Sequence, residues 1–270
     1  MINKNIAIIG AGNLGQAIAK GLLASRIINA EQLILSRRHL SKIKNFEKEG
    51  VRITQDNKEA VKNSDIVILS VKPYKFDEVI EEINPFLNLD KILISVVTGI
   101  DIKKIKNSLS KEISIFRAMP NTAIAIQESM TCISTDNPSD TNIEWVTKIF
   151  DQLGKTAIID DELMDAATVL AASGIAFALR YIRASMQAGV EIGFHSDLAQ
   201  LIAAQTVKGA SDLILQSGHH PEKEIDKVTT PLGITITGLN QMEFKGFSSS
   251  VIKGVLESYN KIVKIKNDKK

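Results

Sequence analysis

The sequence predicts an α/β fold in which a mostly parallel sheet with covering helices precedes a domain made only of helices. Short apolar runs typical of buried strands alternate with helix-forming segments through residues 1–159, which is the pattern of a parallel sheet with right-handed crossovers. After Asp160 and Asp161 the strand signals end and long helical patterns dominate. We therefore expect two domains, comprising residues 1–160 and 161–270.

The composition agrees with a folded globular protein. Hydrophobic residues make up 44% of the 270 residues, and the formal net charge is only +2. This charge balance favours neither nucleic acid nor a membrane surface as a partner. The single cysteine, Cys132, excludes an internal disulfide and a multi-cysteine metal site, and we expect no metal.

Two stretches predict where the protein is found. The first residues lead directly into a strand and do not have the pattern of a secretion signal. The longest apolar run, Ala166 to Leu179, is shorter than the ~18 residues of a membrane span, so we expect a buried helix there. Together these stretches predict a cytoplasmic protein.

The first predicted strand, Ile6 to Ile9, runs into a glycine motif. Gly10, Gly12 and Gly15 form G-x-G-x-x-G, and a helix-forming segment, Gln16 to Ala24, follows. Strand, glycine turn and helix in this order are the dinucleotide-binding fingerprint. Gly10 permits the tight turn, Gly12 lets the backbone approach a pyrophosphate, and Gly15 lets helix and strand pack closely. The first amides of the helix can hold phosphate; a plain tight turn is the alternative.

The second predicted strand, Gln32 to Ser36, favours one cofactor over another. It ends in Ser36, Arg37 and Arg38, without the acidic residue that usually binds the ribose 2′-hydroxyl of NAD. A hydroxyl and two guanidinium groups suit a 2′-phosphate, because arginine offers fork-shaped donors to phosphate oxygens. The pattern favours NADP over NAD. The alternative is that both arginines are solvated loop charges.

The rest of the first domain continues the alternation. Strands are expected at 51–54, 65–71, 91–97, 114–120, 130–134 and 155–159, with helices at 40–50, 58–62, 76–86, 102–109 and 142–153. The strand 65–71 ends at Lys72 and Pro73, where proline stops the strand and fixes a loop. That loop lies at the carboxyl edge of the sheet, where ligands of such sheets bind.

The second domain begins with the stretch Leu163 to Gly189, which is rich in alanine and apolar throughout. We expect this helix to be buried on most sides. Further helices are expected at 198–216, at 221–228 and from 236 to the end. Helices this apolar need a partner surface, so we expect a homodimer or a higher homo-oligomer through residues 161–270. The alternative is a monomer whose helices pack on the first domain alone.

Several stretches together resemble the pyrroline-5-carboxylate reductase family, and they keep its order and spacing over nearly the whole chain. They are Gly10–Gly15, Ser70–Pro73, Arg117–Thr122, Asp165–Phe177 and Val228–Leu239, followed by Met242-Glu243 and Gly246-Phe247. The resemblance implies an N-terminal Rossmann-type dinucleotide-binding domain and a C-terminal all-helical substrate and dimerisation domain. It also implies reduction of 1-pyrroline-5-carboxylate to L-proline by hydride transfer from NAD(P)H, the last step of proline biosynthesis, with NADPH preferred.

The resemblance also implies which residues meet the substrate. Thr235 would hydrogen-bond the ring nitrogen and orient or protonate it, and the amides of Ile234 and Thr235 open a helix where a carboxylate can bind. Ser173 and Gly174 would line the same pocket. Thr235 as a helix cap only and Ser173 as a packing residue only are the alternatives. The family often buries its site between two subunits, which would bring Thr235 from the partner chain.

A second group is expected at the cofactor, at the carboxyl edge of the sheet. Its members are Gly10, Gly12, Asn13, Leu14, Ser36, Arg37, Asn57, Val71, Lys72, Pro73, Val97 and Asn121. Lys72 is expected to act through its backbone, with its side chain in solvent.

The chain departs from the family pattern in two motifs. Ala172 and Ile175 stand in the stretch that usually reads Ser-Gly-Ser-Gly-Pro-Ala-Tyr, and Leu232 and Ile234 stand in the one that usually reads Ser-Pro-Gly-Gly-(Thr or Ala)-Thr. Leu232 replaces a glycine. If this position needs a positive φ, leucine costs about 1–2 kcal/mol. These changes concern substrate affinity more than the fold or the cofactor.

Two other functions remain open at this point. One is reduction of another cyclic imine or a small acid. Hydroxy-acid relatives place a catalytic lysine in the first long helix of the second domain, whereas Leu163 to Gly189 contains only Arg180 and Arg183 as basic residues, which disfavours alcohol oxidation. The other is a non-catalytic NADP-binding sensor with an altered substrate loop.

Overall fold

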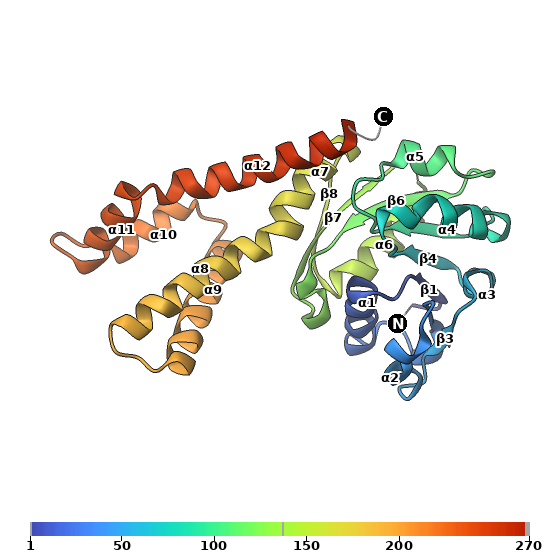
Figure 1. Cartoon of the computed structure of the whole chain (residues 1–270), viewed down its shortest axis with the longest axis horizontal. Helices are drawn as coiled ribbons and strands as arrows, with labels where there is room; N and C mark the ends of the chain where they lie inside the picture. Colours follow the sequence, from blue (N-terminus) through green and yellow to red (C-terminus); the bar gives the residue numbers. More distant parts are fainter. Residues whose placement is uncertain (1, 137, 268–270) are drawn as a thin grey trace. The chain divides into compact units, whose positions relative to one another are not determined.

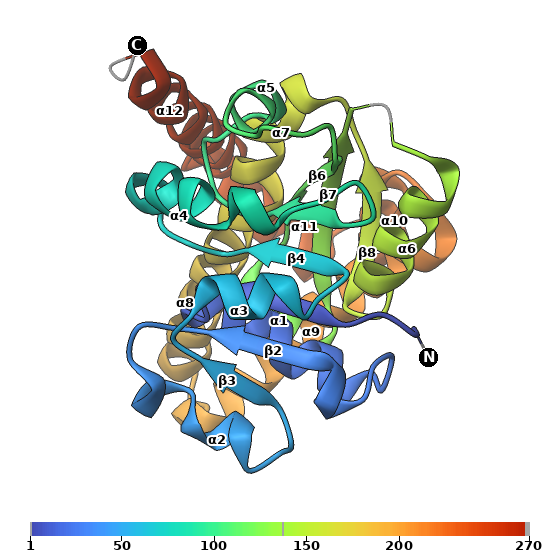
Figure 2. The ribbon, with the colours of Figure 1, turned by 90° about the vertical axis from the view of Figure 1, so that its right-hand side faces the viewer.

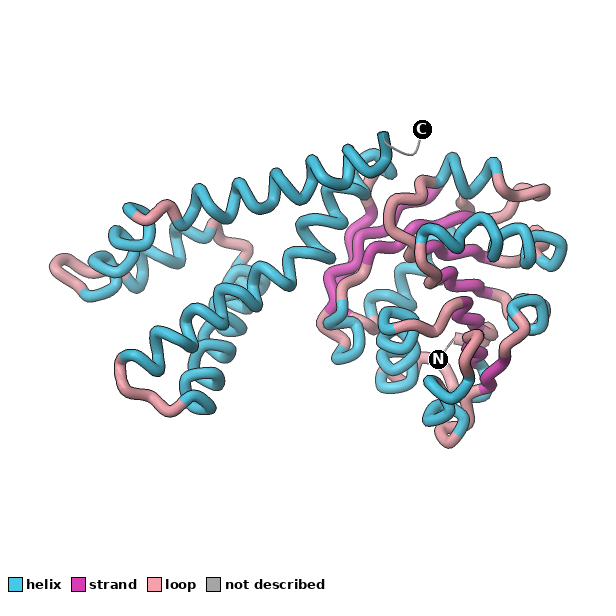
Figure 3. Tube along the Cα trace, in the orientation of Figure 1, coloured by secondary structure: helices cyan, strands magenta, loops and turns pink. Residues whose placement is uncertain are grey.

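The computed structural model describes residues 2–136 and 138–267. Contacts divide the chain into two compact units, Met1–Ser173 with Lys261–Lys270 and Gly174–Asn260, and each is described by itself. Figures 1 and 3 show strands in the first unit and helices in the second. This confirms the predicted fold class. The predicted domain boundary at residue 160 stays a prediction.

The first unit is built on one sheet. Within the described residues eight strands pair in the order β3-β2-β1-β4-β5-β6-β7-β8, and Figure 2 labels six of them, β2, β3, β4, β6, β7 and β8. The strands are β1 Ile6–Ile9, β2 Leu33–Ser36, β3 Arg52–Thr54, β4 Ile66–Leu69, β5 Ile92–Ser95, β6 Ser114–Met119, β7 Ser129–Thr135 and β8 Gly154–Ile158. Neighbouring strands are parallel except for β6 and β7. The strand order reverses between β1 and β4, the usual ligand position in such sheets.

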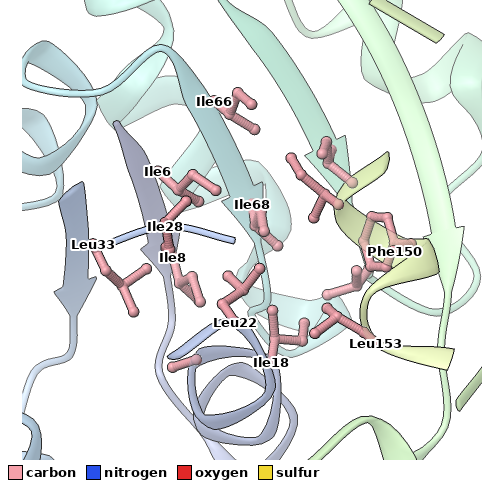
Figure 4. Close-up of a cluster of buried hydrophobic side chains, with 14 of the residues drawn as sticks. Ile6, Ile8, Ile18, Leu22, Ile28, Leu33, Ile66, Ile68, Phe150 and Leu153 are labelled. Atoms are coloured by element: carbon pink, nitrogen blue, oxygen red, sulfur yellow. The ribbon is translucent and has the colours of Figure 1, made fainter. Parts of the chain in front are cut away.

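Helices cover both faces of this sheet. They are α1 Asn13–Ala24, α2 Lys44–Glu47, α3 Asn57–Lys62, α4 Phe76–Ile83, α5 Ile102–Asn107 and α6 Asp140–Asp151. Because side chains alternate along a strand, Ile6 and Ile8 of β1 pack with α1, α2 and α6, whereas Ala7 and Ile9 pack with α3, α4 and α5. Figure 4 shows Ile6, Ile8 and neighbouring side chains of the first cluster. Double coverage explains why these strands are continuously apolar.

The chain then becomes helical. The helices are α7 Met164–Ala167, a π-helical segment Thr168–Ser173, α8 Gly174–Glu191, α9 Ser196–Ser217, α10 Pro221–Val228, α11 Ile234–Phe244 and α12 Phe247–Asn267. The predicted single helix from 163 to 189 is therefore interrupted by a π segment. The helix expected from residue 236 onward is two helices, which separate at Gly246, a residue with a φ of +79°.

The prediction that the first long helix is buried on most sides is wrong for the single chain. No residue of α8 is buried, and Leu179 is 57% exposed. Within Gly174–Asn260 the buried apolar residues are Ala199 and Ala203 of α9. An apolar sequence indicates that a surface needs covering, but it does not say which surface covers it.

One helical stretch, Asp161–Glu191, is long and apolar enough to cross a membrane by length and composition, with 22% of its most apolar window buried. It is longer than the apolar run counted in the sequence, because that run stops before Arg180 whereas the helix continues to Glu191. Core helices of water-soluble proteins pass the same test. The stretch alone is therefore weak support for a membrane span.

Candidate functional site

The loop after β1 fits the close approach of a pyrophosphate. Gly10 has a φ of +91°, and a Cβ there would lie 2.6 Å from the Ser70 carbonyl oxygen. A Cβ at Gly15 would lie 2.8 Å from the Gly10 carbonyl oxygen, so helix and strand are in close contact. At Gly12 the nearest atom to a Cβ is 4.0 Å away. The backbone of Gly12 is therefore open toward a ligand, and each glycine fits its expected place.

The start of α1 offers free donors beside this loop. Gly12 is the N-cap, without a side-chain cap, and the first turn holds no acidic residue. The Gln16 amide donates to the Gly12 carbonyl at 2.9 Å, which leaves the amides of Asn13 and Leu14 without a partner inside the helix. Such amides and the helix dipole favour a phosphate group. The residues present therefore fit a dinucleotide.

The two arginines after β2 differ in the structure. Arg37 is half-buried, and its Nη1 donates to the Ala11 carbonyl at 2.6 Å, which holds the guanidinium beside the glycine loop. Arg38 is 74% exposed and lies 3.7 Å from Glu78. The alternative of a solvated loop charge therefore describes Arg38, whereas Arg37 is placed at the predicted cofactor edge.

Ser36 and Asn57 form one hydrogen-bonded group at the same edge. Ser36 is 1% exposed, and its hydroxyl donates to Asn57 Oδ1. Asn57 is the first residue of α3, and its Nδ2 donates to Glu82 Oε2 of α4 at 2.8 Å. No sequence pattern indicated Glu82 as a member of this group. Its place in a helix was predictable, but its approach to Asn57 depends on α3 and α4 covering the same face.

The segments after β4 and β5 occupy the carboxyl edge as predicted from the strand ends. Lys72 precedes a 3-10 turn, Pro73–Lys75, and the Lys75 amide donates to its carbonyl at 2.8 Å. The Lys72 side chain is exposed and Val71 is half-buried. Val97 is 2% exposed, so its side chain belongs to the core of this unit.

Asn121, after β6, joins the cofactor edge to the π-helical segment. Its Oδ1 accepts from the Ala123 amide at 3.0 Å, and its Nδ2 donates to the Ala171 carbonyl at 3.2 Å. Ala171 lies in Thr168–Ser173, and π turns are frequent at functional sites. The structure therefore brings Asn121 and the segment ending at Ser173 together within the first unit.

An ion pair between the buried Arg117 and the half-buried Asp161 anchors the chain just before α7. Arg117 of β6 is 2% exposed, and its Nη1 lies 2.5 Å from Asp161 Oδ1. The Ser134 hydroxyl and the Ile102 amide also donate to this carboxylate, at 2.7 Å and 3.2 Å. Burial alone raises the pKa of Asp161, but the Ser134 and Arg117 hydrogen bonds and the Arg117 charge outweigh burial and lower it. Arg117 of the family-like motif is therefore a structural residue here.

The remaining candidates lie in the second unit, where α11 begins at Ile234. Gly233 is its N-cap and no side chain caps the helix. Within the described part of the chain the Thr235 hydroxyl has no hydrogen-bond partner, so the cap-only interpretation of Thr235 finds no support. Ile234 is 92% exposed, and Gly174 is the first residue of α8. The approach of these residues to the sheet edge stays a prediction.

Leu232, just before α11, adopts the left-handed conformation. Its φ is +58° and its side chain is fully exposed at 104%. This is the conformation in which leucine costs about 1–2 kcal/mol relative to glycine. A Cβ at the next residue, Gly233, would lie 2.6 Å from Thr230 Oγ1. The loop therefore keeps the shape that favours glycine while carrying a leucine.

The described residues of this site do not form a cluster of metal ligands. Among residues 2–136 and 138–267, no three His, Cys, Asp or Glu side chains gather to hold a metal ion. The chemistry available to the described residues is anion binding by amides and Arg37, and hydrogen bonding by hydroxyl and amide side chains.

Comparison with known proteins gives two family matches and several relatives. Residues 161–265 match the family described as pyrroline-5-carboxylate reductase dimerisation, and residues 5–99 match NADP oxidoreductase coenzyme F420-dependent. Pyrroline-5-carboxylate reductase 2 of Dictyostelium discoideum is 46% identical over 96% of this chain and 92% of its own length. Reductase 1 of that organism is 46% identical over 100% of this chain, which spans 51% of that relative.

A solved structure agrees with these matches. The Plasmodium falciparum pyrroline carboxylate reductase, described with NADP bound, has a TM-score of 0.89 and 27% identity, and the match covers 98% of this chain and 99% of that chain. The Coxiella burnetii pyrroline-5-carboxylate reductase has the same TM-score of 0.89 and covers 97% of this chain and 98% of its own.

Proposed function

The chain belongs to the pyrroline-5-carboxylate reductase family, and we propose that it reduces 1-pyrroline-5-carboxylate to L-proline. The observation that carries the proposal is the glycine loop with its open backbone at Gly12 and free amides at Asn13 and Leu14. This loop fits the nicotinamide dinucleotide that the reaction requires. When bound, the cofactor supplies the hydride that is added to the C=N carbon.

We propose that NADPH is preferred over NADH. Arg37 supports this preference, because its guanidinium is held beside the glycine loop by the Ala11 carbonyl and guanidinium groups bind phosphate oxygens well. Replacing Arg37 with alanine should weaken NADPH binding much more than NADH binding. Equal weakening of both would mean that Arg37 does not recognise the 2′-phosphate.

We propose that α11 binds the substrate. The amides of Ile234 and Thr235 in its first turn suit a carboxylate, and the unpartnered Thr235 hydroxyl can orient the ring nitrogen or give it a proton. A protonated imine is already electrophilic, so a strong general acid is not required. Ser173 and Gly174 would line the same pocket.

We further propose a cytoplasmic homodimer formed through the C-terminal helices, residues 161–270, with no nucleic acid or membrane as partner. Support comes from the apolar side chains that the second unit leaves exposed, including Leu179, Ile192 and Leu201 at 57%, 77% and 64%. Large apolar surfaces of this kind mark interaction sites. Sedimentation of the purified chain tests this proposal: a monomer at micromolar concentration would contradict it.

The activity is tested with the purified full chain. We expect 1-pyrroline-5-carboxylate to drive NADPH oxidation with proline as product, and NADH to work less well. Reactions without substrate and with a panel of hydroxy acids and other cyclic imines are the controls. Tight NADPH binding without oxidation of this substrate would overturn the proposal and favour another imine or a sensor.

A further inference from the structure

The edge of the sheet where β2 ends carries a carboxylate that the sequence does not place there. The strand itself ends in a serine and two arginines, but Glu82 reaches this edge from α4. It does so through Asn57, the first residue of α3. Helices α3 and α4 cover the same face of the sheet, and both are labelled with β2 in Figure 2.

The hydrogen bonds fix the direction of each group. Asn57 has one acceptor oxygen and two N–H donors. Ser36 is 1% exposed, so its hydroxyl finds its acceptor inside the protein, at Asn57 Oδ1. The Asn57 Nδ2 then donates to Glu82 Oε2 at 2.8 Å. The Ser36 proton is thereby committed to Asn57 and is not offered to a ligand.

Glu82 decides this orientation, because an ionised carboxylate only accepts hydrogen bonds. If the Asn57 amide turned over, its oxygen would face the Glu82 oxygen, and the two acceptors would repel. With Glu82 present the amide nitrogen must point toward α4. Without Glu82 both orientations of the amide become accessible.

We propose that Glu82 is a positioning residue of the dinucleotide site, which acts by fixing the Asn57 amide and, through it, the Ser36 hydroxyl. This inference rests on the proposed function, since Asn57 is expected to contact the cofactor. Glu82 itself does not touch the reacting atoms. Its contribution is to keep the cofactor-facing side of Asn57 in one orientation before the ligand arrives.

The expected change in the cofactor Kd depends on the fraction of molecules that hold the Asn57 amide in the binding orientation. If half of the molecules carry the turned amide, the apparent Kd for the cofactor doubles, and further loss of order raises it more. We therefore expect Glu82→Ala to raise the Kd for NADPH and NADH by about two- to fivefold. KM for the cofactor should rise similarly, with kcat and KM for the imine unchanged. Glu82→Gln can present either its oxygen or its N–H groups to Asn57, so it no longer excludes the turned amide and should raise the Kd much as Glu82→Ala does.

The matched control is Glu81→Ala, which removes the same charge from the neighbouring, exposed position of α4. It should leave the Kd unchanged. A double-mutant cycle adds a second readout: in an Asn57→Ala background, Glu82→Ala should have no further effect. Thermal unfolding of each variant shows whether the fold is kept.

The binding constants are measured by titrating NADPH fluorescence with the full chain, without substrate. If wild-type protein binds no NADPH, the proposed function fails. If wild type binds and Glu82→Ala binds equally well, or if Glu82→Ala weakens binding as strongly without Asn57 as with it, the positioning role of Glu82 is wrong.

Discussion

The two units of this chain differ in how far they bury their apolar residues. Every residue of β1 in the first unit is fully buried at 0% exposure, whereas α8 in the second has no buried residue. Both segments are apolar in sequence. The sheet unit therefore completes its own core, whereas the helical unit leaves apolar side chains exposed in the single chain, which supports the proposed homodimer.

The same contrast separates the two halves of the proposed site. The cofactor residues at the sheet edge are already held by hydrogen bonds, as in Ser36 to Asn57 and Arg37 to the Ala11 carbonyl. The substrate residues Ile234 and Thr235 stand at an exposed helix start after a strained leucine. We therefore expect cofactor binding to need one chain and catalysis to need the assembled homo-oligomer.

The largest effect is expected from the Arg117–Asp161 ion pair of the sheet unit. Asp161→Ala leaves the Arg117 guanidinium buried without its counter-charge and should lower the free energy of unfolding by about 3 kcal/mol. Denaturant unfolding measures this loss. Asp160→Ala, at the adjacent exposed carboxylate, is the control and should change the free energy of unfolding little. An equal loss in both variants would mean that the ion pair with Arg117 is not the cause.

The same pair predicts a pH dependence. The pKa of Asp161 is held below its ordinary value of 3.8, so its stabilisation is present above that pH and is lost as the pH falls through the lowered folded-state pKa. The stability difference between wild type and Asp161→Asn should be constant near neutral pH and shrink below about pH 4. A difference that grows on acidification would have the wrong sign.

Two exposed leucines, one in each unit, test whether α8 forms part of a subunit interface. Leu179 of α8 and Leu89 before β5 are 57% and 71% exposed, so the single chain should tolerate a charged side chain at either position. Leu179→Glu should weaken self-association by about 2 kcal/mol, and Leu89→Glu should leave it unchanged. Sedimentation equilibrium distinguishes them. Equal behaviour would mean that α8 does not belong to the subunit interface.

The smallest effect concerns the loop before α11. Leu232→Gly removes the strain of a φ of +58°, but glycine also gains freedom in the unfolded chain, so the net gain should be about 1 kcal/mol. Leu232→Ala keeps a Cβ and should give no such gain. If alanine stabilises as much as glycine, the backbone strain is not the cause.

Much of the sheet unit was predictable from the sequence, because a strand buried on both faces must be a continuous apolar run. The strand ends then placed Gly10, Ser36 and Val71 at one edge. The antiparallel direction of β7 and the π segment before Gly174 have no comparable sequence pattern. Glu82 was missed because its contact joins two helices whose neighbourhood depends on the whole topology.

In the helical unit, the sequence predicted the helices at 198–216 and 221–228, and the resemblance placed a helix start after Gly233, but the break at Gly246 was missed. The sequence did not predict the exposure of α8, since apolar residues look the same whether their own chain or a partner covers them. The left-handed conformation of Leu232 was only conditional in the sequence, because leucine itself gives no signal for a positive φ. The structure supplies that angle.

We propose that the sheet edge of one chain works with Thr235 of a second copy, and mixing two variants, each defective in one half of this site, tests the proposal. Gly12→Val should fold, because a Cβ at Gly12 has no atom nearer than 4.0 Å, but it blocks the pyrophosphate; Thr235→Ala removes the hydroxyl. Half of the randomly mixed dimers combine both variants, and each of these has one intact site of two, so about a quarter of wild-type activity should return. No recovery after subunit exchange would contradict the claim and place Thr235 with the cofactor of its own chain.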